Sequence, residues 1–383
     1  MKSLFISKKY TIFVKNKLKM KNIKFGFDDV NIVPEVITDI MHRSDCYVDT
    51  SDLFFAAPMS SVVSTRNLRD FIDNGITPVI PRTVSIDERM GITRYFPNGL
   101  YFVAFSLQEI KDNFFSDAPF FGVPRICIDV ANGHMSDVIE TIKALKDKYG
   151  PNIVVMAGNI ANPKTYKAYD EAGCDYVRCG IGGGSGCLTA SNTGVFYPLF
   201  SLLKETYEVK KKIGGKCKII ADGGIRGYKD IQLALLYADC VMMGGLFNKS
   251  IESAGKTTYG KSYFVTKSGK KYLNIFRTLF EYGKIVPKEK YKSVMERVKS
   301  GKLEVWKEFY GMSSKRAQKE MGNKTLKTSE GVSKKHLVEY DMEGFMENEI
   351  SYLKSAMSYT NSRNLEEYKD SNWVAKISIG HNK

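Results

Sequence analysis

The sequence has few of the residues on which cross-linked or metal-held folds depend. Its 383 residues include seven cysteines, an odd number without a Cys-x-x-Cys pair, and only four histidines. A disulfide framework and a structural zinc site both need more regular sets of these residues, so the sequence argues against both. Unpaired thiols are typical of a reducing compartment, and we expect a cytoplasmic protein.

Long apolar runs and nucleic-acid-binding signatures are also missing. No apolar stretch is long enough to cross a bilayer, and residues 1–20 are a basic N-terminal extension whose apolar patch, 10–14, is too short for a signal peptide. The formal net charge is +15, but the basic residues are dispersed, without a zinc-finger, helix-turn-helix or RNA-binding signature. Dispersed charge is typical of a solvated surface, so we expect neither a membrane nor a nucleic acid as partner.

What the sequence does contain is an alternation of short apolar runs and amphipathic stretches. Short continuous apolar runs indicate strands buried on both faces, and helical patterns between them indicate parallel strands. The predicted strands cover 53–57, 77–80, 100–105, 125–130, 153–157, 176–179, 218–221 and 240–243, and the predicted helices cover 65–74, 135–148, 163–172, 197–212 and 227–238.

About eight such units predict an α/β fold of the (β/α)8 TIM-barrel type, with a doubly wound sheet as the alternative. Polar and glycine-rich turns follow the strands, which favours the barrel, because there the carboxyl ends of all strands meet at one catalytic face. We expect the barrel to occupy residues 21–365, with an insertion at about 259–307 and a polar C-terminal tail at 366–383. Within the insertion, the basic stretch 288–302 is predicted to be helical.

The most informative stretch is the glycine-rich loop Gly180-Ile-Gly-Gly-Gly-Ser-Gly-Cys-Leu-Thr189. Glycines let backbone amides approach an anion or a flat ring, and a cysteine among exposed amides tends toward the reactive thiolate. Cys187 is therefore a candidate nucleophile, with Thr189 beside it. The turns Asp222-Gly-Gly224 and Gly244-Gly245 fit the phosphate site that barrels form after their last strands. The cysteines at 127, 174, 179, 217 and 240 are interpreted as packing residues.

Further motifs occur in a fixed order between residues 20 and 365. They are Asp129-Val-Ala-Asn-Gly133, Met156-Ala-Gly-Asn159, Thr193-Gly-Val-Phe-Tyr-Pro198, Ala221-Asp-Gly-Gly224, Met243-Gly-Gly245, Tyr310-Gly-Met-Ser-Ser314 and Ser329-Glu-Gly331, with the Cys187 loop between the second and the third. As a set they resemble the IMP dehydrogenase/GMP reductase family, and more closely its reductases. The resemblance implies a purine nucleotide as substrate, a covalent cysteine adduct at purine C2 and hydride transfer involving a nicotinamide.

Two reactions occur in this family. The reductase converts GMP and NADPH to IMP and ammonia, whereas the dehydrogenase oxidises IMP to XMP with NAD, using an Arg-Tyr pair on a long flap to activate water. This sequence has no Arg-Tyr pair between Gly311 and Glu330, has Gly311-Met-Ser-Ser314 in the reductase form, and lacks an insertion large enough for regulatory domains. These features favour a GMP reductase using NADP(H). The alternatives are an IMP dehydrogenase without regulatory domains, using NAD(H), and a non-catalytic nucleotide-binding protein.

The resemblance also implies roles for individual residues. Cys187 is expected to be the nucleophile, and Thr189 and Glu330 the relay that protonates the departing ammonia. Carbonyls of Gly182, Gly184 and Cys187 are expected to bind a monovalent cation, potassium, and the protein is expected to be a homotetramer. The expected substrate-binding residues are Ser185, Asp222, Gly223, Gly224, Gly244, Gly245, Gly311, Met312, Ser313, Lys327, Ser329 and Gly331. The expected cofactor-binding residues are Arg82, Asp129, Val130, Ala131, Asn132, Gly180 and Ile181.

At four positions the sequence departs from the family pattern. Gly183 and Gly186 stand where proline and a β-branched residue are usual, which predicts a more flexible loop. Arg82 stands where lysine is common, and Lys327 where reductases often have arginine. Because lysine cannot form the bidentate fork of arginine, the contacts of Lys327 are expected to differ from those in the family.

Overall fold

A computed structural model describes residues 23–92, 95–96, 99–115, 125–266, 268, 270–273, 288–322, 328–329 and 331–375. Its centre is a closed barrel of parallel strands, β2 to β9, in which β9 returns to pair with β2. The predicted (β/α)8 barrel is confirmed, and the doubly wound alternative is wrong. The barrel strands are β2 (Phe54–Ala56), β3 (Ile76–Ile80), β4 (Phe102–Phe105), β5 (Arg125–Asp129), β6 (Val154–Ile160), β7 (Tyr176–Cys179), β8 (Lys218–Asp222) and β9 (Cys240–Met243).

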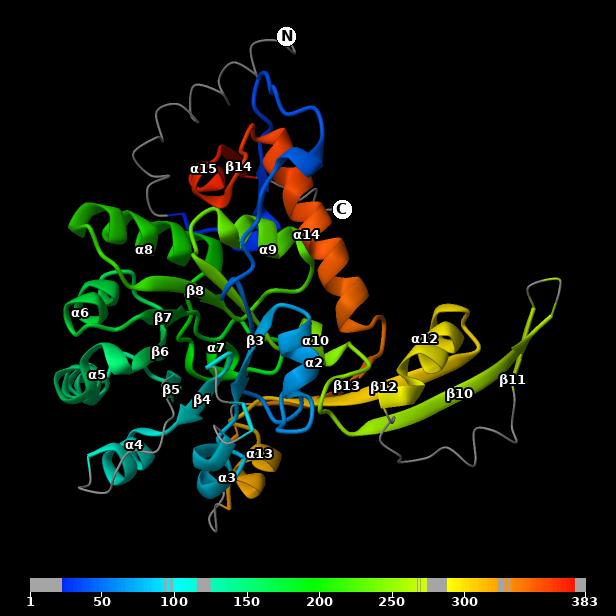
Figure 1. Cartoon of the computed structure of the whole chain (residues 1–383), viewed down its shortest axis with the longest axis horizontal. Helices are drawn as coiled ribbons and strands as arrows, with labels where there is room; N and C mark the ends of the chain where they lie inside the picture. Colours follow the sequence, from blue (N-terminus) through cyan, green and yellow to red (C-terminus); the bar gives the residue numbers. More distant parts are fainter. Residues whose placement is uncertain are drawn as a thin grey trace, which may run out of the picture.

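Helices surround the barrel on the outside (Figure 1). Several begin at side-chain caps; for example, Ser106 accepts a hydrogen bond from the backbone N–H of Glu109 at the start of α4. The helices are α2 (Leu68–Asp73), α3 (Ile86–Gly91), α4 (Leu107–Phe114), α5 (Ser136–Tyr149), α6 (Thr165–Glu171), α7 (Thr189–Thr193), α8 (Leu199–Ile213), α9 (Tyr228–Leu235), α10 (Gly245–Asn248), α12 (Tyr291–Lys299), α13 (Lys315–Glu320), α14 (Met342–Tyr359) and α15 (Leu365–Tyr368).

The core forms two layers separated by the barrel wall. Inside the barrel, the rings of Phe55, Phe102 and Tyr176 meet edge to face, with centroids 5.8, 5.8 and 5.6 Å apart. Outside, the other face of each strand packs against the helices. Every residue of β3 is buried, whichever face it points to. Burial on both faces explains why the strands read as continuous apolar runs rather than as alternating patterns.

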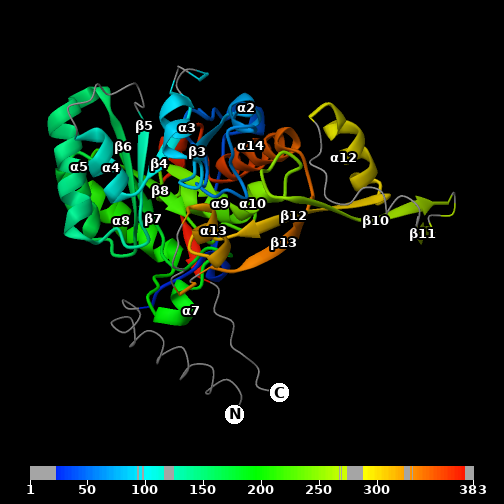
Figure 2. The same ribbon diagram turned by 90° about the horizontal axis from the view of Figure 1, so that it is seen from below.

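An arm projects from one side of the barrel, as Figures 1 and 2 both show. It is built on an antiparallel sheet in the order β11-β10-β12-β13, with α12 packed on it. Val294 and Met295 of α12 are buried with Leu303 and Val305 in a small separate core. The sheet strands are β10 (Thr257–Val265), β11 (Lys271–Leu273), β12 (Leu303–Tyr310) and β13 (Ser333–Leu337).

The predicted insertion at 259–307 therefore forms most of this arm, and the helix predicted at 288–302 is confirmed as α12. Residues 267, 269 and 274–287 of the insertion lie outside the described residues.

The two ends of the described chain meet on the outside of the barrel. Strand β1 (Val30–Ile32) pairs antiparallel with β14 (Trp373–Ala375). The indole of Trp373 packs edge to face on Phe200, with ring centroids 4.9 Å apart, and its Nε1 donates to the hydroxyl of Tyr237 at 2.9 Å. Residues 373–375, which belong to the segment 366–383 predicted as a polar tail, are thus held against the barrel by the contacts of Trp373. The sequence-based domain boundaries stay predictions.

Candidate active site

Cys187 lies on the loop that follows β7, at the carboxyl end of the barrel strands. Its Sγ donates to Oγ1 of Thr189 at 3.2 Å, and the backbone N–H of Thr189 points at the same sulfur from 3.5 Å. An amide donor stabilises the thiolate form, which is the nucleophile. The geometry therefore joins the two residues that the sequence analysis paired.

The other six cysteines differ from Cys187 in exposure. Cys187 is partly exposed, whereas all six others are buried. Burial raises the pKa of Cys127 to about 12 and raises the pKa of Cys179 and Cys240 as well. A thiol that is buried and hard to ionise is chemically inert. Cys187 is consequently the best placed of the seven for covalent chemistry.

A second segment of chain holds the cysteine loop. Cys187 and Gly331 form an isolated antiparallel bridge. The N–H of Val332 donates to the carbonyl of Gly186 at 3.1 Å, and the N–H of Gly311 donates to the carbonyl of Val332 at 3.3 Å. Two predicted substrate-binding residues, Gly311 and Gly331, therefore lie beside the candidate nucleophile.

The neighbouring predicted residues are fixed by local contacts. The hydroxyl of Ser329 donates to the carbonyl of Gly331 at 2.8 Å, and the carbonyl of Ser313 accepts from the side-chain amide of Gln318 at 3.1 Å. Met312, between these contacts, is partly buried. Two predicted residues, Lys327 and Glu330, lie outside the described residues.

Three glycine-containing turns meet next to the cysteine loop. A Cβ built on Gly223 would lie 3.3 Å from the backbone N of Gly184, and a Cβ built on Gly245 would lie 3.2 Å from Oγ of Ser185. Added side chains would be crowded here, so glycine backbone and the hydroxyl of Ser185 line this part of the barrel mouth. Gathered around it are Ser185, Gly223, Gly224, Gly244 and Gly245, all of them predicted to bind substrate.

A chain of ion pairs joins residues on and after strands β3, β5, β7 and β8. The guanidinium of Arg178 bridges two carboxylates, contacting Oδ1 of Asp129 at 2.8 Å and Oδ2 of Asp222 at 2.9 Å. Arg82 contacts the other oxygen of Asp129 at 3.2 Å, and the side-chain amide of Asn159 donates to Oδ2 of Asp222 at 2.7 Å. Among the described residues, Oδ1 of Asp222 has no hydrogen-bond partner, which leaves it for a ligand.

The charges in this chain compensate one another. Burial by itself would raise the pKa of Asp129, but Arg178 and Arg82 outweigh it and hold that pKa below its ordinary value. Burial likewise opposes the charge of Arg178, and the two carboxylates outweigh it, so the pKa of the guanidinium is raised. Asp129 and Arg178 therefore stay ionised at neutral pH despite their burial.

The remaining predicted cofactor-binding residues border this charged chain. Val130, Ala131 and Asn132 follow β5, and the last two are exposed at the barrel mouth. Gly180 and Ile181 follow β7, where Ile181 is 8% exposed. The exposed polar and apolar surface next to Asp129 can accept the amide and ring of a nicotinamide.

The carbonyls proposed for a cation lie within one tight turn. The carbonyl of Gly184 accepts from the N–H of Cys187 at 2.9 Å, which uses one of its two lone pairs. Gly182 has a positive φ of 79° and lies against Ala190. Carbonyl oxygens are suitable ligands for a monovalent cation, and the cation site stays a prediction.

Two residues of the site had no role assigned from the sequence. Arg178 lies within the apolar strand β7, and Asn159 lies in the quoted Met156-Ala-Gly-Asn159 motif. An arginine inside a strand that is buried on both faces must be paired, and this rule is the signal that could have identified Arg178. Its partners, however, come from β5 and β8 and are evident only in the folded barrel.

Steric crowding explains why position 186 has glycine in place of the β-branched residue usual in the family. A Cβ built on Gly186 would lie 2.9 Å from Cε1 of Phe309 and 3.3 Å from the N of Gly311. The aromatic ring therefore occupies the space that a β-branched side chain would need. At Gly183 the nearest atom to such a Cβ is 3.7 Å away, which is an ordinary contact.

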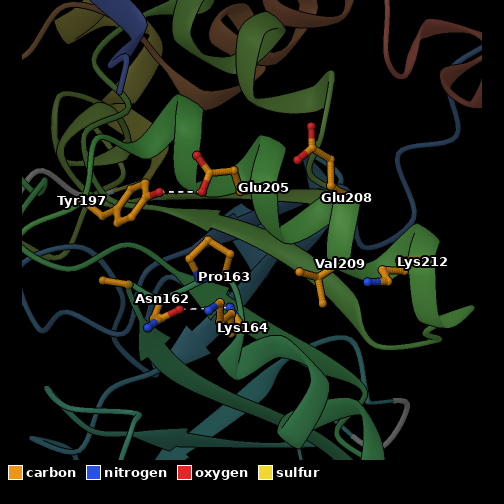
Figure 3. Close-up of a pocket in the computed structure, with 9 residues that line it drawn as sticks. Asn162, Pro163, Lys164, Tyr197, Glu205, Glu208, Val209 and Lys212 are labelled. Carbon is orange, nitrogen blue, oxygen red and sulfur yellow. Dashed lines mark hydrogen bonds between the residues drawn. The ribbon is translucent and has the colours of Figure 1, made fainter. Parts of the chain in front are cut away.

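A shallow cavity of about 450 Å³ lies outside the barrel mouth, between the β6–α6 loop and α8 (Figure 3). Tyr197 and Glu205 lie side by side in its lining, and the tyrosine hydroxyl donates to the carboxylate at 2.6 Å. None of the predicted site residues lines this cavity. Size alone is therefore a poor guide here, and the chemistry lies at the mouth.

Comparison with known proteins agrees with this geometry. The family model described as "IMP dehydrogenase / GMP reductase domain" matches residues 119–278. A GMP reductase from Staphylococcus epidermidis is 31% identical over 273 residues, which cover 68% of this chain and 80% of that protein. Fold and site define a (β/α)8-barrel protein with a cysteine at its mouth. The chain belongs to the IMP dehydrogenase/GMP reductase family of oxidoreductases.

Relatives of both kinds match the chain. An inosine-5′-monophosphate dehydrogenase from Staphylococcus haemolyticus is 41% identical over 147 residues, but these cover only 38% of this chain and 30% of that dehydrogenase. A GMP reductase from Streptococcus suis is 29% identical over 276 residues, 79% of its length. Relatives named for each of the two activities thus belong to the same family. Within the described part of the chain, no helix is long and apolar enough to span a bilayer.

Proposed function

We propose that this protein is a GMP reductase that converts GMP and NADPH to IMP, ammonia and NADP. The observation that carries the proposal is how the segment after Gly311 is tied down. Helix α13 in that segment is anchored through Glu320, whose carboxylate accepts from Oγ of Ser60 at 2.8 Å and from the hydroxyl of Tyr310 at 2.9 Å. The dehydrogenase reaction requires a mobile flap with an Arg-Tyr pair in this interval, and no such pair is present.

The proposed reaction begins at Cys187. Its thiolate attacks C2 of GMP and forms a C–S bond, and the C–N bond to the exocyclic amine then breaks, giving a thioimidate and ammonia. The amine leaves as ammonia only when it is protonated, and Oγ1 of Thr189, 3.2 Å from the sulfur, is placed to pass on the thiol proton. Glu330 is proposed as the second member of this relay.

The second step is a reduction at the same carbon. NADPH supplies a hydride to C2 of the thioimidate, the C–S bond breaks, and Cys187 is released as thiolate with IMP as product. Asp129, Ala131 and Asn132 are proposed to hold the nicotinamide and its ribose, with Arg82 bordering them. A cysteine suits both steps, because it attacks well and also leaves readily.

The substrate is proposed to lie across the barrel mouth. The free Oδ1 of Asp222 accepts from a ribose hydroxyl, and the turns at Ser185, Gly224 and Gly245 hold the phosphate through backbone N–H groups. The purine lies over Cys187 and is recognised by Met312, Ser313, Lys327 and the segment at Ser329 and Gly331. We further propose a potassium ion at Gly182, Gly184 and Cys187, and a homotetramer, which light scattering would measure.

An IMP dehydrogenase activity is the second candidate, favoured by the 41% identity to the S. haemolyticus enzyme. Intact-protein mass spectrometry after incubation with GMP alone separates the two. A reductase gains the mass of GMP less that of ammonia, because the amine leaves before any hydride is needed. A dehydrogenase forms its adduct only from IMP together with NAD.

Cys187→Ala is the matched control for this measurement, and we expect it to show no adduct and at least a 10³-fold loss of turnover, roughly the effect of removing a nucleophile. Cys46→Ala, which changes a buried cysteine near α14, should keep both the adduct and the turnover. A Cys187→Ala protein that turned over as well as Cys46→Ala would refute the proposed mechanism.

A further inference from the structure

His336 is a titratable residue beside the phosphate turns that no sequence motif accounts for. A Cβ built on Gly245 would lie 3.2 Å from Oγ of Ser185 and 3.8 Å from Cε1 of His336. The hydroxyl and the imidazole therefore border the same glycine, one from the cysteine loop and one from β13. The imidazole is also stacked on Phe309, with ring centroids 4.7 Å apart and an angle of 27° between the rings.

The hydrogen bonds of Asn248 determine which imidazole nitrogen carries the proton. The side-chain N–H₂ group of Asn248 donates to the carbonyls of Ser61 and Glu308, at 2.7 and 2.9 Å. Its Oδ1 must then be the acceptor in the 2.9 Å contact with Nδ1 of His336. In the neutral ring, Nδ1 therefore carries the hydrogen and Nε2 carries the lone pair. Among the described residues, Nε2 has no hydrogen-bond partner.

The surroundings of His336 oppose a positive charge. Burial, with the charges of Lys334 and Lys249, lowers the pKa of His336 to about 4, against the opposing charge of Glu339. Glu339 is largely engaged by Lys249, with their charged atoms 2.9 Å apart. On the adjacent strand, Lys307 lies opposite His336 in the β-sheet register, and its ammonium donates to the carbonyl of Ser253. The cations that act on the ring are thus Lys334 of β13 and Lys249 after α10, whereas the ammonium of Lys307 is held by Ser253.

We propose that Nε2 of His336 binds the 5′-phosphate of the nucleotide together with Ser185 and Gly245, and that the imidazole takes up a proton as the phosphate dianion binds. The inference rests on the proposed function, because it takes the phosphate to lie against these turns. The proton comes from solvent and ends on Nε2, which then donates to a phosphate oxygen. No other bond is made or broken.

The arrangement makes the site selective for a doubly charged ligand. Without a ligand, the ring is neutral among lysines, so it adds no further positive charge to a desolvated site. A dianion reverses the local potential and stabilises the imidazolium, as an adjacent negative charge does generally. A hydrogen bond between two charged groups then replaces a weaker neutral contact. A nucleoside, which lacks the phosphate, gains nothing from this residue.

The test is calorimetric titration of the full-length protein with GMP at pH 7.5, in buffers that differ in ionisation enthalpy. The difference between buffers gives the number of protons taken up on binding. His336→Asn keeps a donor toward Asn248 but lacks Nε2, whereas His336→Gln can place an amide N–H near the position of Nε2 without being able to titrate. His42→Asn changes an exposed histidine in a surface turn and serves as the control.

We expect wild type and His42→Asn to take up more protons with GMP than either His336 variant. The affinity of His336→Asn for GMP should fall by roughly 10- to 100-fold, the effect of losing a hydrogen bond to a charged group, and His336→Gln should recover part of it. Guanosine binding should be unchanged in all variants. KM should rise in His336→Asn with little change in kcat, because the contact is made equally in substrate and transition state.

Equal GMP affinity and equal proton uptake in wild type and His336→Asn would overturn the inference and leave the proposed function intact. A wild-type protein that binds neither GMP nor IMP would overturn both. Loss of guanosine binding along with GMP binding in both His336 variants would assign the residue a structural role and would also overturn the inference.

Discussion

The two sides of the barrel mouth are built in different ways. On the phosphate side, the turns around Ser185, Gly224 and Gly245 approach one another closely, and the surface presented to a ligand is glycine backbone with the side chains of Ser185 and His336 beside it. On the cofactor side, the surface rests on charged side chains, with Arg178 clamped between Asp129 and Asp222. Cys187 lies on the loop between them.

Because of this difference, substitutions are expected to destabilise the two sides in different ways. A glycine turn held at positive φ needs no compensating charge, but an added side chain strains its backbone. A chain of buried ion pairs tolerates small shifts of position but not the loss of a partner, because each remaining charge is then left desolvated. Substitutions on the phosphate side should therefore act through steric strain, and those on the cofactor side through electrostatics.

The largest effect on stability is expected at the charged side. Arg178→Met leaves the carboxylates of Asp129 and Asp222 buried and facing each other, and breaking a buried pair in this way costs about 3–5 kcal/mol. Urea unfolding would measure the loss. The control is Arg363→Met, because Arg363 and its partner Asp39 are 50% and 69% exposed, and such surface pairs contribute about 0–1 kcal/mol. Equal unfolding free energies for the two variants would contradict the comparison.

A smaller but still clear effect is expected on the phosphate side. Gly224 has φ of 73°, and a Cβ there would lie 3.2 Å from the carbonyl oxygen of Gly183, so Gly224→Ala should lose about 1–2 kcal/mol through the cost of a left-handed backbone conformation. Gly183→Ala is the matched control, since its Cβ has ordinary contacts only and should change stability by less than about 0.5 kcal/mol. Equal unfolding free energies for the two alanine variants would contradict the expectation that steric strain determines the stability of the phosphate side.

The smallest effect is a pH dependence on the charged side. Because the arginines outweigh burial and lower the pKa of Asp129, its ionised form stabilises the folded state fully above the unfolded pKa of about 4. This contribution is lost as the pH falls through the lower folded pKa. Asp129→Asn should therefore lose less unfolding free energy than wild type as the pH falls below 4. Parallel acid profiles for wild type and variant would contradict the assignment.

Much of the fold could be predicted from the sequence, because burial on both faces leaves a continuous apolar signature at strands such as 125–130 and 176–179. The arm could be predicted only in part. Its helix has an amphipathic pattern, but β12 reads ambiguously, since Lys307 is buried within it and bonded to the carbonyl of Ser253. A buried lysine in a strand gives a polar signal where the structure has an inward-facing position.

The candidate site divides along similar lines. Cys187 and the glycine turns could be located from local motifs, because a positive φ or a close backbone approach demands glycine whatever lies nearby. The partners of Arg178, the ring of Phe309 against Gly186 and the position of His336 could not. Each depends on contacts between segments far apart in the chain, and no local pattern encodes which strands become neighbours.

The most direct test of the central claim is the absorbance of the nicotinamide at 340 nm, followed with purified protein in two mixtures. We predict that absorbance falls with GMP and NADPH, that ammonia is released in equal amount, and that Cys187→Ala does neither. We predict no change with IMP and NAD. A rise in absorbance with IMP and NAD, together with no consumption of NADPH in the mixture with GMP, would contradict the account and identify the protein as a dehydrogenase.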